Sequence, residues 1–188
     1  MGAVLSVPAK VRHVHWDSLQ GDTAFLHVLE QMGCGSKEES DGILLTPPAD
    51  GTLAGGTFDL SAFSDQALTL AAIACFARES VTITGIGHIR YQECDRFSAI
   101  LTNLSHMGIT CESPREGVIV IYPGKPHGCR IETFEDHRVA MSFAIPGLVT
   151  EGIVIENPGC CRKTFENYFE VLEASLFPEM SLERNQRR

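Results

Sequence analysis

Long apolar runs are absent from this sequence. No stretch reaches the roughly 20 consecutive apolar residues that a membrane-spanning helix needs, and the first residues do not have the pattern of a secretory signal peptide. We therefore expect no membrane association and a cytoplasmic location.

Paired cysteine motifs are also absent. The seven cysteines are an odd number, follow no regular spacing and include no CxxC. Cys160 and Cys161 are adjacent, which is poor geometry for chelating a metal ion. This pattern is typical of reduced thiols in a cytosol rather than of a disulfide framework, and we expect no metal site.

Basic residues are fewer than acidic ones. Lys and Arg total 15 against 24 Asp and Glu, a formal net charge of -9, which disfavours general binding to nucleic acid or to an anionic membrane. A local basic pocket for an anionic metabolite is compatible with this balance. The length of 188 residues, with 44% hydrophobic and 21% charged residues, is that of one ordinary globular domain.

The segment 133–145, TFEDHRVAMSFAI, carries the clearest functional signal. Thr133 is the predicted N-cap of a helix, with Asp136 at its third position in the form of a capping box. The apolar residues that follow leave almost no polar face, which predicts a helix buried nearly all round. Its N-terminus favours an anion, and Arg138 adds a planar fork for phosphate or carboxylate. A capped core helix with a solvated first turn is the alternative.

Two pairs of segments indicate an internal repeat. FLHVLEQMG from Phe25 matches ILTNLSHMG from Ile100 in residue type, with a period of roughly 75 residues. SDQALTLAAI from Ser64 matches EDHRVAMSFAI from Glu135 in the same way. Hydrophobic periodicity predicts helices over 22–32, 67–77, 97–107, 133–145 and 164–174, and strands over 4–7, 43–45, 53–60, 81–84, 118–121 and 153–155.

Each unit is thus predicted to contain a buried helix, a strand, a polar loop and a surface helix. Three surface helices accompany only two buried ones, so the first unit is expected to lack its front. If a threefold pseudo-axis relates the units, the polar groups at the N-termini of the buried helices and in the loops converge at one end of the domain. Two carboxylates for proton transfer and several cations for phosphate then share a face. A purely structural repeat is the alternative.

Four motifs, in order, resemble the C-terminal half of the 5-enolpyruvylshikimate-3-phosphate (EPSP) synthase family: SDQALT from Ser64, ECDR from Glu93, DHRVAM from Asp136 and CRKTFENYFE from Cys161. The resemblance implies an α/β fold, an inside-out α/β barrel built from repeated units with buried parallel helices, the first unit being truncated. It implies a C-terminal domain over 1–176 without its N-terminal partner domain, followed by a polar tail over 177–188. It also implies a cleft between two such domains as the substrate site.

The implied reaction transfers the enolpyruvyl group of phosphoenolpyruvate to the 5-hydroxyl of shikimate 3-phosphate, in the route to chorismate and aromatic amino acids, with no metal or organic cofactor. By the resemblance, Asp65 accepts the hydroxyl proton, Glu93 protonates the methylene carbon and Asp95 supports Arg96. The remaining matched positions are His137, near the leaving phosphate, and the substrate-binding residues Gln92, Arg96, Arg138 and Lys163. Gln92 stands where many members of the family have a Lys that contacts the shikimate phosphate.

Two other functions stay open at this point. One is a domain of the related transferase that acts on UDP-N-acetylglucosamine, against which the ECDR and DHRVAM motifs argue. The other is a non-catalytic fragment that binds a partner. Because the resemblance covers one half of a two-domain enzyme, we expect the chain to be inactive unless the N-terminal half is present, in cis or in trans.

Overall fold

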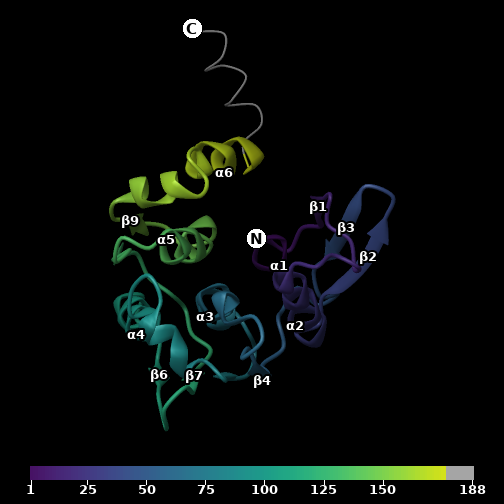
Figure 1. Cartoon of the computed structure of the whole chain (residues 1–188). Helices are drawn as coiled ribbons and strands as arrows, with labels where there is room; N and C mark the ends of the chain where they lie inside the picture. Colours follow the sequence, from purple (N-terminus) through teal and green to yellow (C-terminus); the bar gives the residue numbers. More distant parts are fainter. Residues whose placement is uncertain (177–188) are drawn as a thin grey trace, which may run out of the picture.

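The computed structural model describes residues 1–176, which form an α/β fold of three related units (Figure 1). The residues predicted as a polar tail, 177–188, lie outside the described part, so the predicted domain boundary stays a prediction. In the described part, no helix combines the length and the apolar character that crossing a membrane requires.

The first unit consists of a small antiparallel sheet and one surface helix. Its strands lie in the order β1-β3-β2. Lys10 of β1 pairs with Leu44 of β3, and Lys37 of β2 pairs with the other side of the same residue. The elements, in chain order, are α1 (Gly2–Leu5), β1 (Ala9–Arg12), η1 (Gly21–Ala24), α2 (Phe25–Gln31), β2 (Gly35–Glu39) and β3 (Gly42–Thr46).

The second unit has the same strand order with one strand added. Its sheet runs β4-β5-β7-β6, in which β4 is parallel to β5 and the other pairs are antiparallel. Its elements are β4 (Gly56–Asp59), η2 (Ser64–Gln66), α3 (Ala67–Ala74), β5 (Val81–Thr84), η3 (Gly87–Tyr91), α4 (Arg96–His106), β6 (Cys111–Glu112) and β7 (Ile119–Ile121).

The third unit repeats the beginning of the second. Strand β8 pairs in parallel with β9, as β4 does with β5. Its elements are β8 (Arg130–Ile131), α5 (His137–Phe143), η4 (Pro146–Leu148), β9 (Val154–Ile155), η5 (Pro158–Lys163) and α6 (Tyr168–Leu176). The repeat predicted from the sequence is therefore confirmed by the strand order.

The two central helices are mostly buried, and five of the seven residues of α5 have no significant exposure. Seven of the eight residues of α3 are buried, the exception being Thr69. Thr69 forms a hydrogen bond with Ser142 of α5, with 3.2 Å between their hydroxyl oxygens. This contact satisfies both hydroxyls where the two helices meet, so the predicted pair of buried helices is confirmed.

Several predicted helix and strand boundaries are wrong. The helix predicted over 164–174 begins only at Tyr168, and the strand predicted over 53–60 covers only Gly56–Asp59. Residues 4–7 do not form a strand, because the four-residue helix α1 ends at Ser6 in the left-handed conformation (φ 53). Thr133 does not cap the next buried helix, because Phe134 and Glu135 both have positive φ (52 and 58), and the helix begins only at His137. Asp136 is the actual N-cap, accepting the Arg138 backbone N–H at 2.8 Å.

Candidate active site

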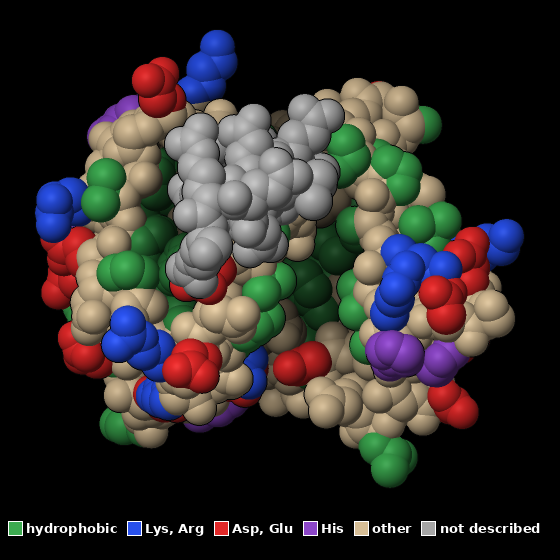
Figure 2. Space-filling view, turned by 90° about the horizontal axis from the view of Figure 1, so that it is seen from above, with side chains coloured by type: hydrophobic (Ala, Val, Ile, Leu, Met, Phe, Trp, Pro, Cys, Tyr) green, Lys and Arg blue, Asp and Glu red, His purple; other side chains and the backbone are tan. Residues whose placement is uncertain are grey.

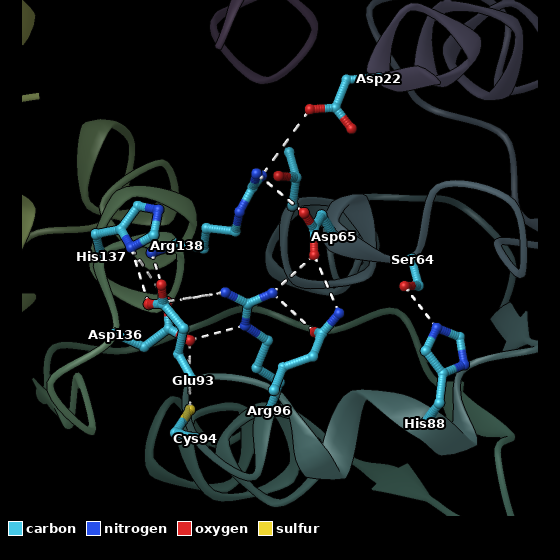
Figure 3. Close-up of polar contacts among 12 residues, drawn as sticks. Asp22, Ser64, Asp65, His88, Glu93, Cys94, Arg96, Asp136, His137 and Arg138 are labelled. Carbon is cyan, nitrogen blue, oxygen red and sulfur yellow. Dashed lines mark hydrogen bonds and ion pairs between the residues drawn. The ribbon is translucent and has the colours of Figure 1, made fainter. Parts of the chain in front are cut away.

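Arg96 is the centre of the polar network that the repeat brings together (Figure 3). It is the first residue of α4, directly after the N-cap Asp95, and only 3% of it is exposed. Its Nη1 donates to Asp65 Oδ1 and to Gln92 Oε1, both at 2.8 Å. Its Nε donates to Asp136 Oδ2 at 2.7 Å. The guanidinium therefore links the N-termini of the two buried helices.

Asp136 is the buried carboxylate of this network, with an exposed fraction of 0%. Burial acts to raise its pKa, but the hydrogen bonds and charge of Arg96 outweigh burial, so its pKa lies below the ordinary value. Asp136 also accepts a weak hydrogen bond from the Cys94 thiol, at 3.6 Å between Sγ and Oδ2. Burial and the charge of Asp136 raise the pKa of that thiol to about 12. Asp136 is therefore ionised and Cys94 protonated at neutral pH.

Glu93 lies on one side of Arg96, with two further basic groups on a single carboxylate oxygen. Its Oε2 is 2.8 Å from Lys163 Nζ, 3.0 Å from His137 Nδ1 and 4.0 Å from Arg96 Nη2. The hydrogen bond from Lys163 lowers the pKa of Glu93 against a smaller opposing effect of burial. Because η5 of the third unit presents Lys163, this cluster joins the second and third units.

Asp65 lies on the other side of Arg96, in η2 just before α3. Its Oδ1 accepts from Arg96 and, at 3.2 Å, from Gln92 Nε2. Its Oδ2 is 3.0 Å from Arg138 Nη2, and Arg138 is 4.0 Å from Asp22 of the first unit. An open pocket of about 350 Å³ is lined by Asp22, Asp65 and Gln92 among others. All three units therefore contribute to one polar face.

The seven predicted site residues thus lie in one connected network, as the repeat led us to expect. Sequence reasoning missed the importance of Asp136, which it assigned only a capping role. It also assigned Asp95 as the support of Arg96, which is wrong. Asp95 instead pairs with Arg90 at 3.1 Å and caps α4 through the Ser98 N–H, while Asp136 holds Arg96.

A metal ion has one candidate position among the described residues. Side-chain ligand atoms of Glu93, Asp136 and His137 lie within 4.8 Å of one another. The same carboxylates already bind Arg96 and Lys163. A metal ion at this position would be repelled by these two side chains unless they moved away. Arg96 and Lys163, which pair with Asp136 and Glu93, make this position unfavourable for a further cation.

Comparison with known proteins identifies the family of this chain. The family model of EPSP synthase (3-phosphoshikimate 1-carboxyvinyltransferase) matches residues 1–172. The 3-phosphoshikimate 1-carboxyvinyltransferase of Nostoc punctiforme is 44% identical over 167 residues, which cover 89% of this chain and 38% of the relative. The chloroplastic protein of the same name from Arabidopsis thaliana is 38% identical over 161 residues, which cover 83% of this chain and 31% of the relative.

Solved structures agree with this comparison. An EPSP synthase from Acinetobacter baumannii superposes with a TM-score of 0.75 at 25% identity, covering 90% of this chain and 42% of that one. The enolpyruvyl transferase NikO from Streptomyces tendae, at 20% identity and a TM-score of 0.59, shows the fold alone. The chain spans less than half the length of the relatives that it matches. With a family model that matches nearly all of the described residues, this chain belongs to the EPSP synthase family.

Proposed function

We propose that this chain supplies the C-terminal share of a 3-phosphoshikimate 1-carboxyvinyltransferase active site in the cytoplasm. The reaction transfers the enolpyruvyl group of phosphoenolpyruvate to the 5-hydroxyl of shikimate 3-phosphate and releases phosphate, a step of the shikimate pathway. One observation carries the proposal: a single buried guanidinium, Arg96, lies between the carboxylates of Asp65 and Glu93, with Arg138 and Lys163 at the two ends.

The proposed chemistry uses the two carboxylates in opposite directions. Asp65 accepts the 5-hydroxyl proton as the oxygen bonds to C2 of phosphoenolpyruvate, and Glu93 donates a proton to the methylene carbon. In the second step the new methyl group loses a proton, the C=C bond forms again and phosphate leaves, near His137 in this proposal. Proton transfer and cationic stabilisation suffice for these steps, so the proposal includes no metal or organic cofactor.

The cations receive the anionic substrate in this scheme. Phosphoenolpyruvate carries a carboxylate and a phosphate, which suit the planar forks of Arg96 and Arg138 and the point charge of Lys163. The hydrogen bond from Lys163 lowers the pKa of Glu93. An anion that draws Lys163 away and adds negative charge raises that pKa again. Substrate binding thereby prepares Glu93 to act as an acid.

The remaining substrate ligands come, in this proposal, from the part of the relatives that the chain does not span. That N-terminal half acts in cis or in trans, and the residues described here are inactive without it. In this proposal Gln92 contacts shikimate 3-phosphate, and its amide is also engaged by Asp65 and Arg96. It therefore positions Asp65 as well as contributing a neutral hydrogen-bonding group.

The test combines this chain with the N-terminal part of the Nostoc punctiforme relative, produced as a separate polypeptide. We expect phosphate release from the mixture but not from the chain alone, and weak or undetectable calorimetric binding of phosphoenolpyruvate to the chain alone. Asp65→Ala and Glu93→Gln should each slow the mixture by at least about 10²-fold. Glu112→Gln, at an exposed carboxylate bonded to Tyr122, is the matched control. Turnover by the chain alone, or unchanged turnover with Asp65→Ala, would refute the proposal.

A further inference from the structure

One short turn carries two residues of the polar network. Residues 92–95 connect η3 to α4 and belong to neither, and Gln92 and Glu93 lie in this turn. A backbone hydrogen bond from the Arg96 N–H to Cys94 O, at 2.9 Å, spans its end. Because no helix or strand includes these four residues, their position also depends on contacts made by side chains at the two ends of the turn.

Arg90 joins the two ends of this turn. It lies in η3, and its Nη1 donates to Asp95 Oδ2 at 3.1 Å and to Ser98 Oγ at 3.3 Å. Asp95, the last residue of the turn, accepts the Ser98 N–H at 2.9 Å and so caps α4. The guanidinium carbon of Arg90 lies 4.0 Å from the centre of the buried Phe97 ring, whose face attracts a cation. Arg90 thus fastens η3 to the first turn of α4.

Ion pairing alone would not give Arg90 a special role. Figure 2 shows Lys or Arg side chains beside Asp or Glu side chains at several places on one face of the molecule, and exposed pairs contribute little to stability. Arg78 and Asp50 form such a pair at 3.0 Å, with side chains that are 52% and 58% exposed. The Arg90 side chain is 33% exposed, packs on a buried ring and encloses a turn that carries site residues.

We propose that Arg90 is a positioning residue, which holds the turn so that the Glu93 carboxylate meets Lys163 and His137. Glu93 Oε2 lies 2.8 Å from Lys163 Nζ and 3.0 Å from His137 Nδ1, two groups of the third unit. If the turn moved relative to α4, these contacts would become intermittent. The effect on catalysis rests on the proposed function, in which Glu93 donates the proton. A shift of about 1 Å can slow such a step by about 10²-fold.

The first test uses the chain alone and does not depend on turnover. The hydrogen bond from Lys163 lowers the pKa of Glu93, so a turn that is held less firmly should raise that pKa towards its ordinary value. We expect an NMR titration of the side-chain carboxyl groups to show this rise in Arg90→Ala and in Asp95→Asn. Circular dichroism checks that each variant folds, and Asp95→Asn decides the test if Arg90→Ala does not fold.

Asp95→Asn separates positioning from a direct effect of charge. Asparagine is also a good N-cap, so α4 keeps its start, while the ion pair with Arg90 is lost. Removing a nearby negative charge by itself lowers the pKa of a carboxyl group, whereas positioning predicts that the pKa of Glu93 rises. The two explanations therefore predict shifts of opposite sign.

The matched controls are Arg78→Ala and Asp50→Asn. Asp50 resembles Asp95 in that it pairs with an arginine and accepts a backbone N–H, from Thr52 at 3.0 Å. Neither control variant should change the pKa of Glu93.

The second test measures phosphate release by the chain mixed with the N-terminal part of the Nostoc punctiforme relative. Arg90→Ala should lower kcat by about tenfold and leave KM for phosphoenolpyruvate within about threefold, because Arg138 and Lys163 lie on other elements. Asp95→Asn breaks the same contact, so the double variant should be no more than about twofold slower than the slower single variant. Arg90→Lys keeps the charge but not the planar fork, and should recover part of the lost kcat.

Several results would overturn the proposal. They are a pKa of Glu93 that falls or stays unchanged in Asp95→Asn, an equal rise in the control variants, additive losses in the double variant, or turnover that Arg90→Ala leaves unchanged. A raised pKa of Glu93 in the variants, together with no turnover by the mixture that contains the unchanged chain, would reject the proposed function and leave the positioning of Glu93 standing.

Discussion

The sharpest test of the buried network is Asp136→Asn. Asparagine has nearly the same shape and keeps an oxygen for the Arg138 N–H, so the N-cap of α5 survives. What is lost is the negative charge that Arg96 Nε and Nη2 contact at 2.7 and 3.3 Å. The substitution therefore isolates the charge of one fully buried group.

The expected loss of stability follows from the surroundings of Arg96. Removing one partner of a buried ion pair costs about 3–5 kcal/mol, because the other charge stays buried without compensation. Arg96 keeps its contact with Asp65 at 2.8 Å. The loss of stability expected for Asp136→Asn is therefore at the lower end of this range, about 3 kcal/mol. Asp136→Ala also removes the cap, which adds about 1 kcal/mol. Glu93→Gln, at a carboxylate that is 39% exposed, should cost less than about 1 kcal/mol.

Urea unfolding followed by far-ultraviolet circular dichroism measures these differences. Because the folded-state pKa of Asp136 lies below the ordinary 3.8, its charge contributes fully above that value. The contribution is lost as the pH falls through the lower folded-state pKa. The free-energy gap between the unchanged chain and Asp136→Asn should thus stay constant from pH 7 to about pH 5 and shrink below about pH 4. An Asp136→Asn loss no larger than that of Glu93→Gln would refute the reasoning.

Two further predictions concern a site residue and a core residue. Lys163→Met should raise the pKa of Glu93, because the hydrogen bond from the Lys163 ammonium is the main cause that lowers it. An NMR titration of the side-chain carboxyl groups measures this pKa, and an unchanged value would contradict the prediction. Asn103→Ala should reduce the free energy of urea unfolding by about 2–4 kcal/mol. The buried Asn103 amide satisfies both the N–H and the C=O of Glu132, at 3.0 and 2.9 Å, so a loss below about 1 kcal/mol would contradict this account.

The sequence alone determined those helices and strands whose residue pattern is compatible with only one way of packing them in the fold. The stretch that became α3 has no polar face, so burial was its only stable arrangement. Strand β5 lies where the hydrophobic periodicity predicted it. Helix α4 also lies where periodicity predicted it, and it ends just before Gly108, whose φ of 75 suits a helix C-terminus. Repetition of these units also predicted that the acids and cations meet, because equivalent positions of related units face the same end.

Tertiary structure decided the features that depend on partners distant in sequence. Local propensity placed the start of the helix at Thr133, but Phe134 and Glu135 adopt left-handed conformations and Asp136 becomes the cap. The carboxylate that holds Arg96 is Asp136, forty residues away, rather than its neighbour Asp95. Neither choice is visible in a local pattern, because each depends on the packing of α4 against α5 and on the high cost of leaving a buried guanidinium unpaired.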